Sequence, residues 1–176
     1  MKTFIPEMSH TVSMVRIFGT IIIVVGTIGN LLSIFTLSRR TMRTQPTACF
    51  LLALAISDLG VIYSVYFSHY LKVGFDIKIR HSNTFVCKLT VYLGYLFLQL
   101  SPSLLAAVSV QRLFCIKYAT KWSKLCTLNA ARTVICLLYL LAILDNLHFL
   151  YFYELQTGAG GTVNYCGVLH STAYYT

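Results

Sequence analysis

The sequence predicts an all-α membrane protein with four transmembrane helices, and two observations carry this prediction. Hydrophobic residues make up 57% of the 176 residues and charged residues only 11%, whereas about a quarter of a soluble domain is charged. Four apolar stretches also reach the roughly 20 residues that a helix needs to cross a bilayer. Because the backbone in lipid must satisfy its own hydrogen bonds, each stretch is expected to be a helix. The stretches cover residues 17–38, 47–71, 89–110 and 133–153.

The first two stretches have recognisable beginnings. Residues 17–38 contain no charge, and no cleavable signal peptide precedes them, so this stretch is expected to act as its own insertion signal. Residues 47–71 follow Pro46. Proline is favoured in the first turn of a helix because it has no backbone N–H, and an N–H at that position would have no partner within the helix. The charge within this second stretch is Asp58.

The third and fourth stretches lead into different kinds of segment. Residues 89–110 carry no charge and are followed by a basic loop. Residues 133–153 carry Asp145 and are followed by residues 154–176. Glycines in this last segment separate two short β-prone stretches, which is typical of a β-hairpin. They are Gly158, Gly160 and Gly161.

The basic residues predict the orientation in the membrane. Loops 39–46 and 111–132 hold eight Lys and Arg and no acid, whereas the other connecting segments hold six bases and three acids. By the positive-inside rule, the amino terminus is expected outside the cell, in a multi-pass protein of the cell membrane. Residues 1–16 and 154–176 are then extracellular and flank a four-span bundle of residues 17–153.

The six cysteines divide between the two sides of the membrane. In this orientation only Cys87 and Cys166 lie in extracellular segments. Disulfides persist outside the cell and are rare in the cytosol, so these two are expected to pair. The alternative is a pair of free thiols in loops. The remaining cysteines are expected to stay reduced, and they are Cys49, Cys115, Cys126 and Cys136.

Three polar residues inside the spans form a candidate switch. An intramembrane carboxylate such as Asp58 is costly and therefore indicates function. Antiparallel packing would bring Asn30 of the first span and Ser101 of the third close to Asp58, in a cluster able to hold water or a cation. The alternative is a set of polar contacts that only hold helices together.

Several motifs occur in an order that resembles a known family. Gly29-Asn30 lies in the first span, the run from Leu54 to Asp58 (Leu-Ala-Ile-Ser-Asp) in the second, and Cys87 heads the third. Arg112 follows Cys87 by 25 residues, at the inner end of the third span. Together these motifs resemble the rhodopsin-like (class A) G-protein-coupled receptors. The resemblance covers nearly the whole chain and implies the first four helices of a seven-helix bundle, truncated after the second extracellular loop.

The chain departs from the family pattern at two informative places. The family's Asp-Arg-Tyr motif reads Gln111-Arg112-Leu113 here, so the carboxylate that would pair with the arginine is missing. The resemblance nevertheless implies that Arg112 and Gln111 contact a G protein. The fourth span lacks the family's tryptophan, and Leu138 stands near that position.

The outer halves of the spans suggest a ligand class. Receptors for amines carry an Asp seven residues after the third-span cysteine, where this chain has Gly94. A mixed polar and aromatic pocket with a hairpin loop instead resembles neuropeptide receptors. The alternative is that these side chains only stabilise helix packing. The candidate pocket residues are His69, Lys72, Tyr95, Gln99, Asp145 and His148.

These observations define the predicted function. No catalytic motif, metal-ligand spacing or cofactor site is present in the sequence, so an enzyme is not expected. Nucleic-acid binding is not expected either, because the basic residues lie between membrane spans. The prediction is a receptor fragment that binds an extracellular ligand, a peptide, and signals through a heterotrimeric G protein when full length. The alternatives are a tetraspan structural or adaptor protein, and a non-signalling truncated receptor that associates with the full-length receptor.

Overall fold

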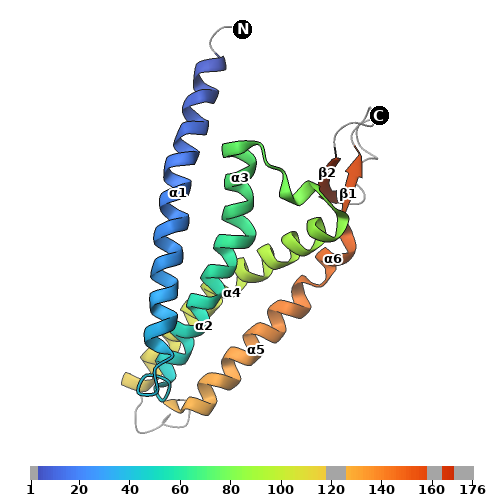
Figure 1. The fold of residues 1–176 in the computed structure, drawn as a ribbon. Coiled ribbons are helices and arrows are strands. Elements are labelled where there is room, and N and C mark those ends of the chain that lie inside the picture. The colour runs from blue at the N-terminus through green and yellow to red at the C-terminus, as the bar shows by residue number, and fades with distance from the viewer. Residues whose placement is uncertain (1–3, 118–125, 158–163, 169–176) are drawn as a thin grey trace.

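The computed structural model describes residues 4–117, 126–157 and 164–168, which form long helices with a small sheet at one end (Figure 1). The helical elements are α1 (Phe4–Leu37), α2 (Pro46–Val61), η1 (Ile62–Tyr66), α3 (Phe67–Phe75), η2 (Ile79–His81), α4 (Thr84–Lys117), α5 (Leu128–Asn146) and α6 (His148–Phe152). The strands are β1 (Tyr153–Thr157) and β2 (Asn164–Val168).

Four helical rods in the described part of the chain are long and apolar enough to cross a membrane, which confirms the predicted fold class. Each has at least 25 residues, which at about 1.5 Å per residue exceeds a hydrocarbon core of about 30 Å. Each rod is therefore long enough to extend beyond the bilayer core. The rods run Val12–Leu37, Pro46–Phe75, Thr84–Lys117 and Leu128–Phe152.

The second rod contains a π-helical turn. α2 passes into η1, where the backbone N–H of Phe67 bonds to the carbonyl of Ile62, five residues back. Wide turns of this kind redirect a helix, and Figure 1 shows α3 running in a different direction from α2. The rod ends at Asp76, whose φ of 55° lies in the left-handed region and stops helical winding.

The core lies between α2 and α4, with α5 packed against both. Leu100 and Leu104 of α4 have no exposed surface and share a buried cluster with Ala53 of α2. Gly60 lies directly against the ring of Phe97, where a methyl group would overlap the ring. Small residues at such positions allow membrane helices to approach closely, because dispersion contacts replace the hydrophobic effect in lipid.

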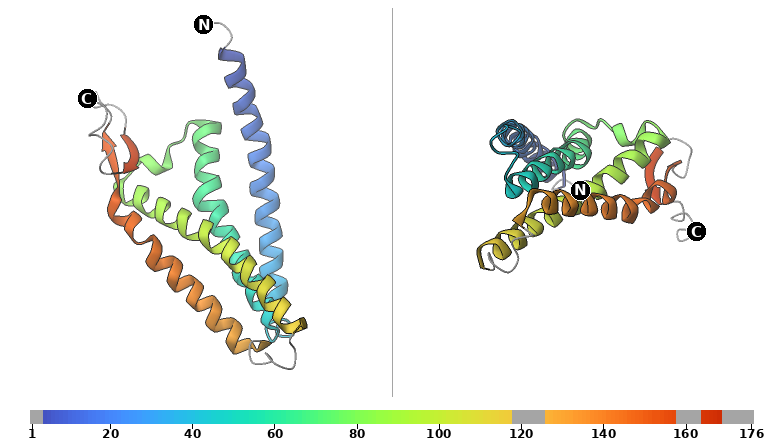
Figure 2. Two further views of the ribbon diagram at one scale, coloured as in Figure 1. Left: turned by 180° about the vertical axis from the view of Figure 1, so that it is seen from behind. Right: turned by 90° about the horizontal axis from the view of Figure 1, so that it is seen from below.

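α1 lies beside α2 and α3 and away from α5 (Figure 2). Its far side is a continuous apolar surface that includes Phe18, Val25 and Phe35, each more than half exposed. Such a surface is compatible with lipid tails. Polar contacts hold α1 near its beginning, where Arg16 Nε donates to the Gly74 carbonyl at 2.7 Å.

The two strands form the antiparallel hairpin that the sequence predicts, with Leu155 opposite Cys166. The three glycines of the predicted turn lie outside the described residues. A disulfide joins Cys166 to Cys87 at the start of α4, with their Cα atoms 5.7 Å apart. This pair is the one selected from the sequence, and it ties the hairpin to the helical bundle.

The structure corrects one expectation about the other cysteines. Cys115 and Cys126 form a second disulfide between the end of α4 and the start of α5, so the prediction that both stay reduced is wrong. The prediction considered only the redox compartment, whereas the fold brings the two Cα atoms within 5.7 Å. Cys49 and Cys136 are free thiols.

Candidate functional site

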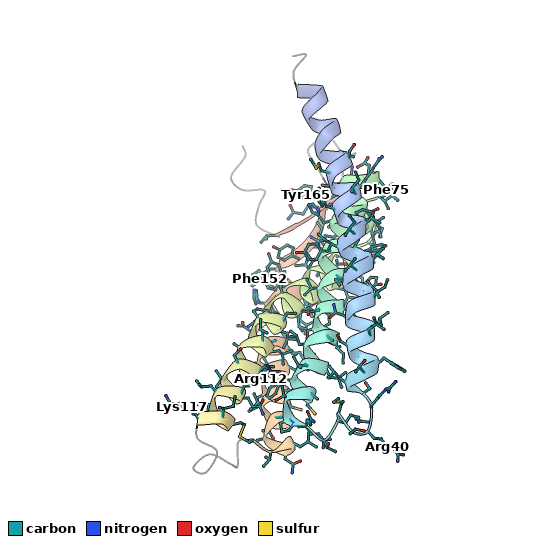
Figure 3. The ribbon with its side chains drawn as sticks, turned by 90° about the vertical axis from the view of Figure 1, so that its left-hand side faces the viewer. Arg40, Phe75, Arg112, Lys117, Phe152 and Tyr165 are labelled. Carbon is teal, nitrogen blue, oxygen red and sulfur yellow. A yellow bond between two sulfur atoms is a disulfide. The ribbon has the colours of Figure 1, made fainter. Side chains whose placement is uncertain are left out.

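The bundle has two ends, which are formed by different elements. Figure 3 shows Arg40, Arg112 and Lys117 near one end and Phe75 and Tyr165 near the other. We call the first the Arg112 end, and the second, which carries η2, β1 and β2, the hairpin end.

Asn30 and Asp58 line one cavity of about 450 Å³ between α1 and α2. The Asn30 side-chain amide donates to the Gly26 carbonyl at 2.9 Å, which fixes its orientation. Ser101, the third predicted member of the cluster, is not among the residues that line this cavity. Its hydroxyl is buried and has no hydrogen-bond partner among the described residues. The structure therefore brings two of the three predicted residues together.

The neighbouring Ser57 faces a different direction and joins α2 to α5. It is completely buried, and its hydroxyl shares a hydrogen bond of 3.0 Å with the Tyr139 hydroxyl. Tyr139 also lies 3.4 Å from the Ala53 carbonyl, to which it donates. Successive residues on a helix point about 100° apart, so Asp58 and Ser57 serve different neighbours. Sequence reasoning missed this pair because composition does not reveal which helix faces meet.

At the Arg112 end, Gln111 connects α4 to the beginning of α2. Its side-chain oxygen accepts a hydrogen bond from the Thr47 hydroxyl at 3.1 Å. Its amide nitrogen lies 3.7 Å from the sulfur of Cys115. Arg112, the next residue, is exposed. Gln111 therefore acts between helices, and the Arg112 side chain lies on the open surface of this end.

At the hairpin end, Gln99 clamps α4 to α5. Its side-chain amide donates to the Asp145 carboxylate at 3.0 Å, and its oxygen accepts from the Asn146 amide at 2.6 Å. Asn146 is buried and also donates to the Ala142 carbonyl at 2.7 Å. Asp145 itself is exposed. Gln99 and Asp145 are thus brought together, with their polar groups used between helices.

Aromatic rings stack beside this clamp. Tyr95 and Phe149 lie 4.2 Å apart with nearly parallel rings, and the His148 ring lies 4.0 Å from Phe149. His148 Nδ1 donates to the Asp145 carbonyl at 2.7 Å. Burial, followed by the neighbouring Tyr95 hydroxyl, raises the pKa of Tyr153 at the start of the hairpin. The rings and hydroxyls of this neighbourhood come from α4, α6 and β1.

Two adjoining cavities hold the remaining predicted pocket residues. His69 and Lys72 line a cavity of about 230 Å³ whose wall includes Cys166. Tyr95 lines a second cavity of about 210 Å³. Arg80 lines both, which places it between them. Sequence reasoning counted Arg80 only as a base of the outer loop, because nothing local in the sequence shows that η2 folds back over α4.

The family comparison agrees with this arrangement. The sequence profile of the family described as 7 transmembrane receptor (rhodopsin family) matches residues 29–175. The chain belongs to this family. The four rods are accordingly the first four transmembrane helices of a rhodopsin-family receptor, and the chain is a multi-pass membrane protein.

Individual relatives in the receptor family share about a quarter to a third of their residues with this chain. Galanin receptor 2a of Danio rerio is 30% identical over 85% of the chain and 41% of its own length. Atypical chemokine receptor 3 of Rattus norvegicus is 29% identical over 89% of the chain and 42% of its own length. Thyrotropin-releasing hormone receptor of Gallus gallus is 24% identical over 86% of the chain and 38% of its own length. The chain thus spans about two fifths of these relatives.

Proposed function

We propose that this chain is part of a receptor that binds an extracellular peptide at the hairpin end and signals to a heterotrimeric G protein through the Arg112 end. The observation that carries the proposal is the pair of adjoining cavities, one with cationic and one with aromatic walls. The hairpin beside them is held to α4 by the disulfide of Cys166. A site of this kind offers both charged and apolar surface, as a peptide requires.

A peptide ligand is favoured over a small amine. Gly94 is buried and lines the aromatic cavity, so no carboxylate is present at this position to pair with an ammonium group. The relatives are named for galanin, thyrotropin-releasing hormone and chemokines. These names are those of peptides and small proteins.

The proposed orientation puts the amino terminus outside the cell. Arg39, Arg40 and Arg43 follow α1 at the Arg112 end without an accompanying acid. The positive-inside rule favours the cytoplasm for such a loop. An exposed Arg112 is then on the cytoplasmic side, where a G protein can contact it.

The Asn30–Asp58 cavity is proposed as the polar switch of the same receptor. A carboxylate in a cavity within the membrane favours water or a cation as its partner. A ligand shifts a receptor between two states only if it binds them with different affinity. A difference in the hydration of Asp58 between the two states would change the equilibrium between them.

Peptide binding to the whole chain in phosphatidylcholine nanodiscs tests the proposal. The probes are galanin, thyrotropin-releasing hormone and a chemokine, each with a fluorescent label. Saturable binding that weakens at least tenfold in Tyr95→Ala is expected, because this change removes the stack on Phe149. Tyr66→Ala is the matched control, since Tyr66 is exposed on η1 and lines neither cavity. Equal losses in both variants, or no saturable binding, would contradict the proposal.

A further inference from the structure

The cavity lined by His69 and Lys72 has an unusual concentration of positive charge. Its wall also contains Lys78, Arg80 and His81. These residues come from α3, from η2 and from the link between them, while Cys166 contributes a wall from β2. Three separate elements therefore converge on a recess of about 230 Å³, and five of its nine lining residues are basic side chains.

The positive charge is only partly neutralised. Asp76 pairs with Lys78 at 3.4 Å, and the Asp76 side chain is 83% exposed and the Lys78 side chain 46%. Among the described residues, neither Lys72 nor Arg80 has an acidic partner within salt-bridge distance. Two cations on the wall of one recess repel each other, so an anion between them would be favoured.

His81 also lines this recess and lies close to the same positive charges. Its Nδ1 atom is buried and has no hydrogen-bond partner among the described residues. Burial lowers the pKa of His81, and the charges of Lys72, Lys78 and Arg80 lower it further. A buried ring nitrogen without a partner calls for a hydrogen-bonding group that the described residues do not supply.

The adjoining cavity is of the opposite character. It is lined by Tyr95, Tyr153, Leu98 and Val91, together with the shared residues Val65 and Arg80. A guanidinium at the boundary presents a planar fork of donors that matches a carboxylate in two parallel hydrogen bonds. A group bound to Arg80 would therefore lie next to aromatic and aliphatic walls.

We propose that the recess formed by Lys72, Arg80 and His81 binds a carboxylate of the peptide ligand, and that the adjoining cavity takes an apolar or aromatic side chain next to it. This inference rests on the proposed function and narrows it to peptides with an acidic side chain. A lipid headgroup is less suited, because the recess is walled by η2 and β2 as well as by α3. Headgroups approach a helix from its flank.

Two peptide pools give a direct test. Both contain heptapeptides with acetylated and amidated ends, whose central residue is Glu in one pool and Gln in the other. The other six positions are random but exclude Asp and Glu. The whole chain is held in phosphatidylcholine nanodiscs, and retained peptide is quantified by mass spectrometry. The Glu pool is expected to be retained about tenfold more, because charge-assisted hydrogen bonds are stronger than neutral ones.

Matched variants distinguish binding at this site from a general attraction of acidic peptides to the positively charged chain. Lys72→Gln and Arg80→Gln should each reduce the preference for Glu to about twofold or less. Lys88→Gln removes the same charge from the start of α4, but Lys88 lines neither cavity, so the preference should remain. Equal retention of both pools, or an equal loss in Lys88→Gln, would overturn the inference.

The outcomes also distinguish this inference from the receptor proposal. If both pools bind equally and Tyr95→Ala weakens both, the receptor proposal stands and the carboxylate site is wrong. If neither pool binds above empty nanodiscs while the labelled peptides bind, the carboxylate inference is wrong and the receptor proposal stands. If the two pools bind equally, while the native chain retains phosphatidylglycerol over phosphatidylcholine and Lys72→Gln does not, a lipid headgroup is the occupant and the inference is wrong.

Discussion

Removing the disulfide between Cys87 and Cys166 is expected to destabilise the bundle more than removing the one between Cys115 and Cys126. A disulfide stabilises largely by restricting the unfolded chain, and the effect grows with the length of the loop that it closes. The two sequence separations are 79 and 11 residues. The chain-entropy relation then gives about 4.5 kcal/mol for the longer loop and about 2.8 kcal/mol for the shorter one at 25 °C.

Both figures are upper bounds for a membrane protein. Helices that stay inserted after the bundle opens already restrict the loops between them, so the cross-link removes less entropy than in water. The bilayer restricts the longer loop through two connecting spans, yet the hairpin beyond α5 has no other covalent tie to α4. We therefore expect the order of the two effects to persist and their difference to fall below about 1.7 kcal/mol.

Two double variants provide the comparison, Cys87→Ala with Cys166→Ala and Cys115→Ala with Cys126→Ala. Each variant is held in a mild detergent without reducing agent and titrated with a denaturing detergent. Circular dichroism gives the midpoint of unfolding. The midpoint should fall further for the first double variant. An equal or larger fall for the second would refute the loop-length reasoning for this bundle.

The Ser57–Tyr139 contact, the His81 ring and the proposed orientation can each be tested separately. Tyr139→Phe should lower the free energy of unfolding by about 1–3 kcal/mol, measured in the same titration, because it leaves the buried Ser57 hydroxyl without its partner. The pKa of His81, measured by NMR, should lie below 6.5, and stability should fall as the pH decreases through 6.5, because the unfolded chain binds the proton more tightly. Glycosylation sites engineered near residues 5 and 160 should both be used, since the amino terminus and the hairpin are proposed to be extracellular.

Each of these predictions has a result that would contradict it. For Tyr139→Phe, this result is a decrease in the free energy of unfolding no larger than the decrease in Tyr66→Phe, because the Tyr66 side chain is exposed. For His81, it is an unchanged pH dependence of stability in His81→Gln. For the orientation, it is glycosylation of a site inserted near residue 122.

The sequence predicted the spans and the hairpin because these depend on local properties. A helix that crosses lipid needs only sufficient length and few charges, and both are visible in the chain. The pairing of Cys87 with Cys166 was also accessible, because the orientation left only two cysteines outside. The pairing of Cys115 with Cys126 was not, since it depends on where α5 begins relative to the end of α4.

The candidate site was predicted less completely because it depends on which helix faces meet. Asp58 and its neighbour Ser57 are both polar, but one lines a cavity beside α1 and the other bonds to α5. Gln99 was expected in a ligand pocket, whereas its amide is bonded to Asp145 and Asn146. Arg80 gained its position only through the folding of η2 over two cavities.

The π-helical turn of η1 affects how this chain should be aligned with other receptors. Such a turn accommodates one more residue than an α-helical turn, and one residue corresponds to about 100° of rotation. His69 and Lys72 lie beyond η1, so the side of the helix on which each of them lies depends on this extra residue. A relative with an uninterrupted second helix would need a one-residue gap near residues 62–66. Without that gap, an alignment would equate Lys72 with a residue on a different side of the helix.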